Sequence, residues 1–199
     1  MEWLHVIVAL CLGVSLSAAS GFRVFVPLLA VSLGVRFGGL EVNDTLAWAG
    51  SDMALIGLSV ATVLEIVTCY VPALDHILVD VSAMVLAPVA GALLTAGVLP
   101  EMSEFVKWSL AIVAGAGVAG TVQMGTTAVR GTSTATTAGT GNFIVATAEN
   151  GASLVGSVMA VVVSPVAAAI GLVLLLGVLF WLVRKWLRAR KRKKMAAAA

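Results

Sequence analysis

One arginine lies inside an otherwise apolar stretch, and it is the residue of this sequence best placed for chemistry. Arg23 stands between Gly21 and Pro27, and apolar or small residues continue on both sides. A guanidinium stays protonated, so in apolar surroundings its charge must be met by an acid, a carbonyl, water or an anionic substrate. The position therefore predicts a binding or translocation site that fits a phosphate or carboxylate group.

Two acidic residues are the candidate partners of Arg23, and a third site candidate, Asp75, is expected nearer the surface. Glu65 and Glu149 lie in or beside apolar segments, and Asp75 follows a turn that contains a proline. Glu65 or Glu149 could also couple proton movement to transport, because burial changes the protonation equilibrium of a carboxyl group. The alternative is an internal Arg–Glu pair that only fixes how the helices pack.

A second polar stretch begins at Arg130 and is rich in threonine and glycine. Residues 133–142 contain no large apolar side chain, and Thr137, Gly141 and Asn142 lie in the second half of this stretch. Threonine hydroxyls and exposed backbone carbonyls can line a water-filled path or replace the hydration of a substrate. The same composition is typical of a flexible loop. We expect the lining role, with an ordinary loop as the alternative.

Composition places these residues in a membrane protein. Of the 199 residues, 60% are hydrophobic and 11% are charged, whereas soluble domains carry about 25% charged residues. At about 20 residues per helical span, the apolar sequence suffices for about five to seven spans. We predict an all-α polytopic membrane protein with about six transmembrane helices. Residues 1–187 are expected to form a single membrane domain.

The glycine and proline positions predict how the first apolar region is divided. Pro27 has no amide proton and disfavours a helical Val26, while Gly21 permits backbone angles that other residues resist. We expect a helix over 3–19, a break at membrane depth, and a short segment over 28–38. That segment is either a re-entrant arm or the tail of a bent span.

The first apolar run also resembles a secretory signal peptide, because it ends in small residues. It is preceded by Glu2 and by no lysine or arginine, so we expect it to be retained as the first span. Further spans are expected over 53–70, 76–97, 105–126 and 148–186. The last is too long for one crossing and contains Pro165, so it is either one kinked helix or two spans.

The two halves of the chain, 1–97 and 104–187, resemble each other weakly. Each begins with a glutamate before an aromatic residue, followed by an apolar span and a glycine-containing break with an arginine nearby. A repeat of this kind predicts halves of opposite orientation, with both breaks near the middle of the membrane. Faces of small residues around Gly91 and Gly115 predict close helix packing, and we expect a homodimer or a higher homo-oligomer.

The end of the chain is strongly basic. Eight of the twelve basic residues lie in 184–194, which predicts a cytoplasmic C-terminus and allows contact with anionic membrane lipids. Nucleic acid is not an expected partner, because the basic cluster adjoins an apolar span. Residues 188–199 are interpreted as a basic tail whose last residues, 195–199, are typical of an added sequence.

Four stretches together resemble a known family. They are the Gly-x-Arg-x-Phe-x-Pro pattern of 21–27, Glu65 leading to Pro72-x-x-Asp75, Pro88-x-Ala90-Gly91, and Ser-Thr-x-Thr-Thr-x-Gly-x-Gly-Asn at 133–142 followed by Glu149. This combination resembles a group of small bacterial membrane proteins that carry a domain of unknown function. Similar proteins often have Pro where this chain has Phe143, and an acid where it has Asn150. The resemblance implies one domain in the bacterial inner membrane and implies no activity.

The residues favour a transporter or channel for a small, anionic solute, with a pocket lined by two broken helices. A lipid translocase acting on a phospholipid or polyprenyl phosphate is an alternative, and a scaffold subunit of a membrane complex is another. An enzyme is not expected, because the sequence has no nucleophile–base pair, no paired histidines and no phosphate-binding glycine loop. No cofactor and no metal site are predicted.

Overall fold

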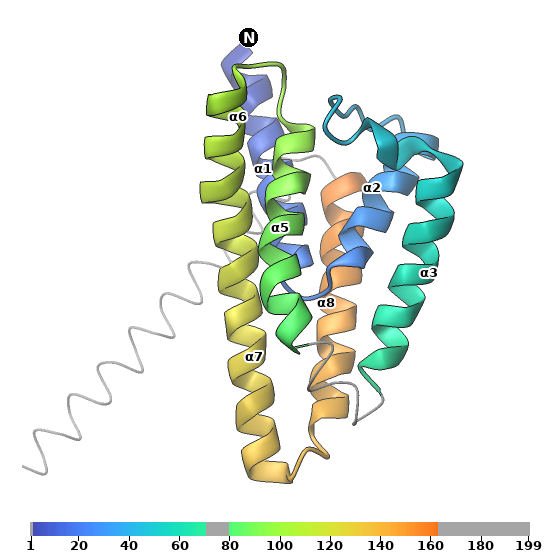
Figure 1. Cartoon of the computed structure of the whole chain (residues 1–199), viewed down its shortest axis with the longest axis vertical. Coiled ribbons are helices and arrows are strands. Elements are labelled where there is room, and N and C mark those ends of the chain that lie inside the picture. The colour runs from blue at the N-terminus through green and yellow to red at the C-terminus, as the bar shows by residue number, and fades with distance from the viewer. Residues whose placement is uncertain (1, 71–79, 163–199) are drawn as a thin grey trace, which may run out of the picture.

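The computed structural model describes residues 2–70 and 80–162, which form a bundle of helices joined by turns (Figure 1). The α-helices are α1 (Glu2–Ser20), α2 (Phe25–Phe37), α3 (Asp52–Thr68), α5 (Asp80–Val98), α6 (Glu104–Leu110), α7 (Gly117–Thr137) and α8 (Asn142–Val162). A 3-10 turn, η1 (Ala47–Gly50), precedes α3, and a π-helical segment, η3 (Ala111–Ala116), joins α6 to α7. The all-α membrane fold predicted from the sequence is confirmed.

Within residues 2–70 and 80–162, three helices are long and apolar enough to cross a membrane. They are Trp3–Ser20, Glu104–Thr137 and Asn142–Val162. The second is the continuous run of α6, η3 and α7. Its 34 residues would extend for about 51 Å, well beyond a hydrocarbon layer of about 30 Å. The helix therefore continues beyond residue 126, where the sequence predicts the end of the span.

The first break forms a re-entrant hairpin. Helix α1 enters the bundle from the N-terminal end, the chain turns at residues 21–24, and α2 returns toward the same end (Figure 1). The turn lies part-way along α7, not at the end of the bundle. With 13 residues, α2 is about 20 Å long, too short to cross a membrane alone. The re-entrant arm is confirmed, and the bent span is not observed.

Small residues let the central helices approach closely. A Cβ atom added at Gly91 of α5 would lie 2.6 Å from the carbonyl oxygen of Gly115 in η3. The hydroxyl of Ser17 on α1 donates to the Gly91 carbonyl at 2.8 Å and lies 2.9 Å from the hydroxyl of Thr95. Such contacts are the usual means of helix association in lipid, and they confirm the packing role predicted for the Gly91 face.

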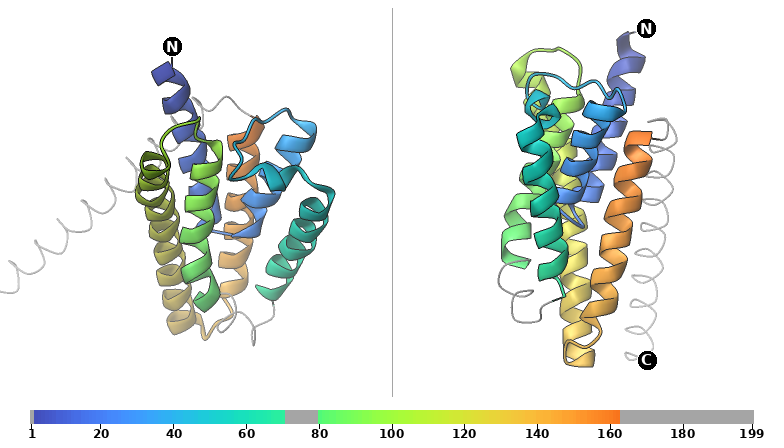
Figure 2. Two further views of the ribbon diagram at one scale, coloured as in Figure 1. Left: turned by 45° about the horizontal axis from the view of Figure 1, so that its top comes forward. Right: turned by 90° about the vertical axis from the view of Figure 1, so that its right-hand side faces the viewer.

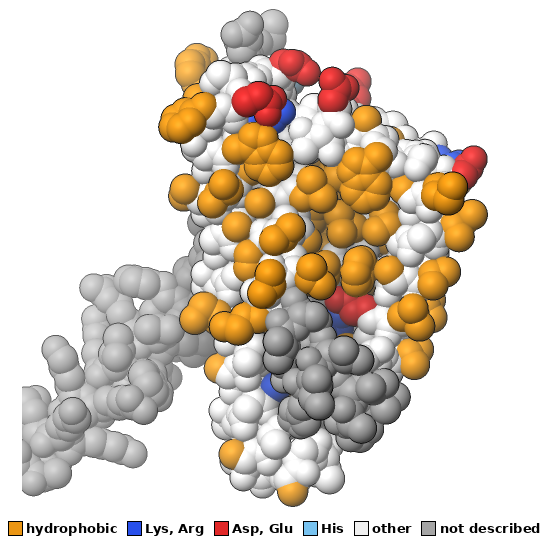
Figure 3. All heavy atoms as spheres, in the orientation of Figure 1, with side chains coloured by type: hydrophobic (Ala, Val, Ile, Leu, Met, Phe, Trp, Pro, Cys, Tyr) orange, Lys and Arg blue, Asp and Glu red, His pale blue; other side chains and the backbone are white. Residues whose placement is uncertain are grey.

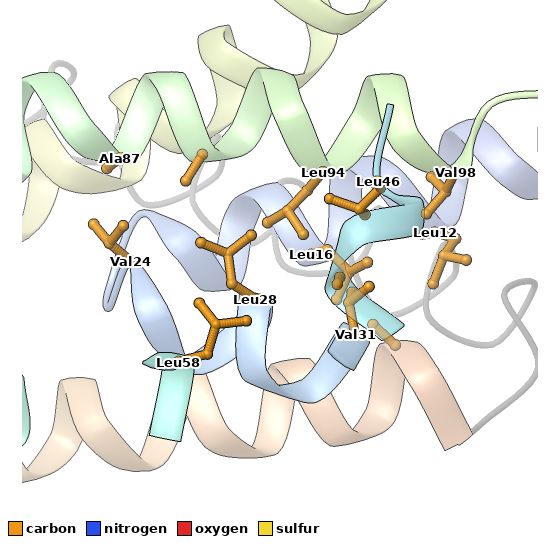
Figure 4. Close-up of a cluster of buried hydrophobic side chains, with 13 residues drawn as sticks. Leu12, Leu16, Val24, Leu28, Val31, Leu46, Leu58, Ala87, Leu94 and Val98 are labelled. Carbon is orange, nitrogen blue, oxygen red and sulfur yellow. The ribbon is translucent and has the colours of Figure 1, made fainter. Parts of the chain in front are cut away.

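A hydrophobic core lies beside these contacts. Figure 4 shows side chains of α1, α2 and α5 facing one another, among them Leu16, Leu28 and Leu94, with Leu58 of α3 at the edge. The outer faces are also apolar. Exposed residues include Met53, Ile56, Val60, Val63 and Val67 on α3 and Leu154, Val155, Val158 and Val162 on α8. Figure 3 shows apolar side chains over the near face of the bundle, as expected for a lipid-facing protein.

The two halves do not show the orientation that an inverted repeat requires. Helix α1 and the long helix Glu104–Thr137 begin at the same end of the bundle and run in the same direction (Figure 2). The polar stretch near Arg130 also forms no break at mid-depth, because α7 remains helical through Thr137. The described residues therefore give the inverted repeat no support.

Candidate functional site

Arg23 is buried at the turn between α1 and α2. Its side chain is 3% exposed and reaches across to α8. Its Nη2 lies 3.2 Å from Oε2 of Glu149, and its Nε donates to Oδ1 of Asn150 at 2.5 Å. The backbone carbonyl of Phe22 accepts from Nη1 at 3.2 Å, and that of Ala146 accepts from Nη2 at 3.5 Å. Of the two acids that the sequence offers as partners of the buried Arg23, Glu149 contacts its guanidinium.

Glu149 lies between two arginines. In addition to Arg23, it accepts from Arg130 of α7, whose Nε donates to both carboxylate oxygens at 3.0 and 3.1 Å and whose Nη2 donates to Oε2. None of the three side chains is more than 6% exposed. A charge removed from water in this way is stable only when it is paired and hydrogen-bonded. One carboxylate thus holds α7, α8 and the re-entrant hairpin together.

Glu65 binds the beginning of α2 rather than the guanidinium itself. Its two carboxylate oxygens accept from the backbone N–H groups of Val24 and Phe25, at 2.7 and 3.0 Å. The first N–H groups of a helix lack partners within the helix and attract negative charge. The N-cap residue of α2 supplies no side-chain cap, so a carboxylate from α3 does so instead.

The local sequence explains the turn. Pro27 lies in the first turn of α2, where its missing N–H removes a donor that would otherwise be unpaired. A Cβ atom at Gly21 would lie 2.6 Å from both the carbonyl oxygen of Ala119 and Cβ of Val122. Glycine is therefore needed because α7 passes directly against the turn. Both residues support the site without taking part in its hydrogen bonds.

Two residues of the site, Asn150 and Tyr70, are not among the contacts expected from the sequence. Asn150, noted there only as a departure from the family pattern, accepts from Arg23, and its Nδ2 donates to the Tyr70 hydroxyl at 3.1 Å. The Tyr70 ring lies against Phe143, with centroids 5.1 Å apart. The sequence gives little sign of the contact between Asn150 and Arg23. Asn150 merely follows Glu149 in the chain, and only the fold shows that Arg23 lies opposite both residues.

The Thr/Gly stretch forms the end of α7 and the turn that leads to α8. Thr137 is exposed at the end of α7, where its hydroxyl donates to the Ser133 carbonyl at 2.7 Å and accepts from Gly141 N–H at 2.9 Å. Residues 138–141 form the tight turn to α8, with Gly139 at a φ of 88°. The hydroxyls of Thr132, Thr136 and Thr137 donate to carbonyls one turn earlier in α7, so this composition is compatible with a helix and a turn. Thr137 and Gly141 thus lie at the turn between α7 and α8, and their lining role stays a prediction.

Asn142 and Arg130 differ from the rest of that stretch because they are buried. Asn142 is 8% exposed, and its Nδ2 donates to the Thr134 hydroxyl at 2.9 Å. The site thus brings together Arg23, Glu149 and Arg130, with Glu65 at the adjoining helix start. Asp75 lies outside the described residues.

Comparison with known proteins shows which family this chain belongs to. The model of a domain of unknown function, DUF4126, matches residues 10–185. The chain belongs to the DUF4126 family. That match includes every residue of the site in this DUF4126 protein and confirms the resemblance seen in the sequence. Searches of curated proteins and of solved structures found no match.

The DUF4126 site combines two features that suit an anion. A helix begins inside the bundle with its N–H groups directed at a carboxylate, and an arginine stands immediately before that helix. Acidic and basic atoms also reach the surface within the apolar face between α5 and α3 (Figure 3). Since charges are rare on lipid-facing surfaces, this place is a candidate for access to the site.

Proposed function

We propose that this DUF4126 protein moves a small anionic solute across the membrane through the site at the start of α2. One observation supports this most: the Glu65 carboxylate, carried by a different helix, accepts from Val24 N–H and Phe25 N–H inside the bundle. A place that holds one carboxylate can hold that of a solute, or a phosphate, by the same donors. Broken helices of this kind are common substrate sites in transporters.

In the proposed mechanism, the solute exchanges with Glu65. As the Glu65 side chain leaves the two N–H groups, the anionic group of the solute takes its place beside Arg23. Protonation of Glu65 would favour the exchange, because a neutral carboxyl group is a weaker partner for the helix start. The solute leaves when Glu65 returns, so binding remains reversible.

Glu149 positions the arginine in this mechanism. It is shared between Arg23 and Arg130, and Asn150 accepts from Nε of Arg23. These contacts hold the guanidinium beside the helix start before a solute arrives. A pre-positioned cation avoids the reorganisation that a mobile side chain would need.

Translocation of a lipid headgroup is a second candidate. It is favoured by the charged atoms that reach the surface within the apolar face of the bundle (Figure 3), because a headgroup could reach the site laterally from the bilayer. Phosphate chemistry is common to both candidates, so the same N–H groups and arginine would serve either ligand.

Reconstituted vesicles test the proposal. Purified protein in liposomes is given radiolabelled inorganic phosphate or lactate outside and the same unlabelled anion inside, and uptake is measured over time. We expect uptake by wild type, and loss of it in Arg23→Ala and Glu65→Gln. Arg36→Ala is the matched control, since Arg36 pairs with Asp52 near the surface at the far end of α2.

Each outcome bears on one candidate. Uptake in wild type that persists in both site variants would contradict a role for this site. The lipid candidate would be favoured by a different pair of results. Neither anion would be taken up, and a fluorescent phospholipid would cross the bilayer faster in wild-type vesicles than in Arg23→Ala vesicles. Variants are compared only after size-exclusion chromatography shows a monodisperse, folded protein.

We also propose a bacterial inner-membrane location with a cytoplasmic C-terminus, and a homodimer or a higher homo-oligomer. The basic cluster at 184–194 supports the orientation by the positive-inside rule. Glycines on the outer face of α7, such as Gly117 and Gly125, have no atom near their Cβ positions, and they could pack against a second copy.

A further inference from the structure

The buried face of α8 is unusual for a packed helix. Its buried residues are Asn142, Ala146, Glu149, Ser153, Ser157 and Ala160, all small, polar or charged. The large apolar side chains of α8 are on its exposed faces. A helix in a soluble bundle would bury the apolar face, and in lipid the buried face is free to be polar.

Two atoms on this face have no hydrogen-bond partner within the described residues. They are Oδ1 of Asn142 and Oγ of Ser157, whose side chains are 8% and 0% exposed. By contrast, the Ser153 hydroxyl between them donates to the Ala19 carbonyl of α1 at 3.0 Å. Leaving a buried polar atom unpaired costs about 1–3 kcal/mol, so such an atom in a native protein calls for an explanation, such as a bound water, an ion or a role in the function.

A third unpaired atom lies across α2. The Oγ1 atom of Thr62 on α3 is buried and has no partner within the described residues. Thr62 precedes Glu65 by one helical turn, on the same face of α3. The unpaired atoms thus belong to the two helices that supply the acids of the site, α3 and α8.

Position along α8 relates the unpaired atoms to the Arg–Glu–Arg cluster. Ser157 lies eight residues after Glu149, about 12 Å along the helix, and Asn142 lies seven residues before it, about 11 Å. Near Ser157, α8 contacts α1 at Ser153 and α2 at Val161, whose Cγ1 lies 2.7 Å from where a Cβ at Gly34 would be. Ser157 is therefore between these contacts, facing the re-entrant hairpin.

We propose that the solute passes along this face of α8, with Ser157 as a subsite on one side of Glu149 and Asn142 as a subsite on the other. A serine hydroxyl can donate to an anion. The Asn142 amide can do so as well, because its oxygen and nitrogen can be exchanged by a flip of the side chain. The inference rests on the proposed function and specifies the route of the same solute.

Thiol labelling tests the route without knowledge of the substrate. In a background with Cys11→Ala and Cys69→Ala, Ser157→Cys is exposed to a negatively charged methanethiosulfonate reagent in lipid vesicles, and the labelled fraction is measured by mass spectrometry. Ala111→Cys is the matched control, because Ala111 is equally buried but packs in η3. We expect the thiol introduced at position 157 to react severalfold faster than the thiol introduced at position 111, and phosphate or lactate to slow the faster reaction.

Flux provides a second readout. Ser157→Ala should lower anion uptake severalfold, whereas Ser59→Ala should leave it unchanged, since the Ser59 hydroxyl donates to the Leu55 carbonyl within its own helix. If the thiol of the Ser157→Cys variant is as unreactive as that of the control while uptake is intact, this route is overturned and the proposed function stands. If the thiol at position 157 reacts but neither anion is taken up, the polar path along α8 stands and the proposed solute class fails.

Discussion

The Arg23 guanidinium lies against the Glu149 carboxylate, with Nη2 of the arginine 3.2 Å from Oε2 of the glutamate. The pair joins the turn of the re-entrant hairpin to the middle of α8, and the same oxygen accepts from Arg130 of α7. Three segments that are distant in the sequence therefore depend on one carboxylate.

Replacing Glu149 with glutamine should destabilise the protein strongly. Loss of the carboxylate would leave two buried guanidinium groups without their shared anion, and breaking such a pair costs roughly 3–5 kcal/mol. The measurement is thermal unfolding in detergent, followed by tryptophan fluorescence. Asp52→Asn serves as the control, because its partner Arg36 is 34% exposed and Asp52 is 78% exposed. An equal, small loss of stability in both variants would contradict this.

Adding one methyl group at Gly21 should also destabilise the fold. The new Cβ of Gly21→Ala would lie 2.6 Å from the Ala119 carbonyl oxygen and from Cβ of Val122, and overpacking of this kind costs about 1–3 kcal/mol. Gly57→Ala is the matched variant on α3, where nothing lies within 4 Å. It should raise stability by up to about 1 kcal/mol, through the better helix propensity of alanine. Similar unfolding temperatures for the two variants would show that α7 does not press against the turn.

Removing the Glu65 carboxylate should loosen the start of α2. In Glu65→Ala the N–H groups of Val24 and Phe25 lose their acceptors, and loss of a helix cap costs about 1 kcal/mol. Hydrogen–deuterium exchange of the peptide covering the turn should become faster. In the control Ser51→Ala, which removes the acceptor of Ala54 N–H, faster exchange should be confined to the start of α3. Unchanged exchange at residues 24 and 25 would count against the capping role.

The part of the site that local chemistry determines could be predicted from the sequence. A glycine, an arginine and a proline within an apolar run were enough to predict the break, the burial of Arg23 and its pairing with an acid. The contact partners Asn150 and Tyr70 could not be predicted, nor could the capping of α2 by Glu65. These contacts depend on how α3 and α8 pack around the hairpin. The spacing of the contacting residues in the sequence does not reveal this packing.

The threonine-rich stretch is helical up to Thr137 for a physical reason. In a helix, a threonine hydroxyl can donate to the carbonyl four residues earlier, as Thr132 does to Ala128 at 2.8 Å and Thr136 to Thr132 at 2.9 Å. A polar composition then leaves the helix intact. The low hydrophobicity of this stretch favours a loop or a pore lining in the sequence. In the structure, the chain continues α7 as a helix to Thr137.

The most direct test of the central claim is rescue of Glu65→Ala by a small carboxylate. If the start of α2 beside Arg23 is an anion site that Glu65 occupies, then formate should bind there once the side chain is removed. Hydrogen–deuterium exchange at residues 24 and 25 of Glu65→Ala should slow again as formate is added, with chloride at the same ionic strength as the control. Ser51→Ala should show no such recovery. Exchange that stays equally fast in formate and in chloride would contradict the account.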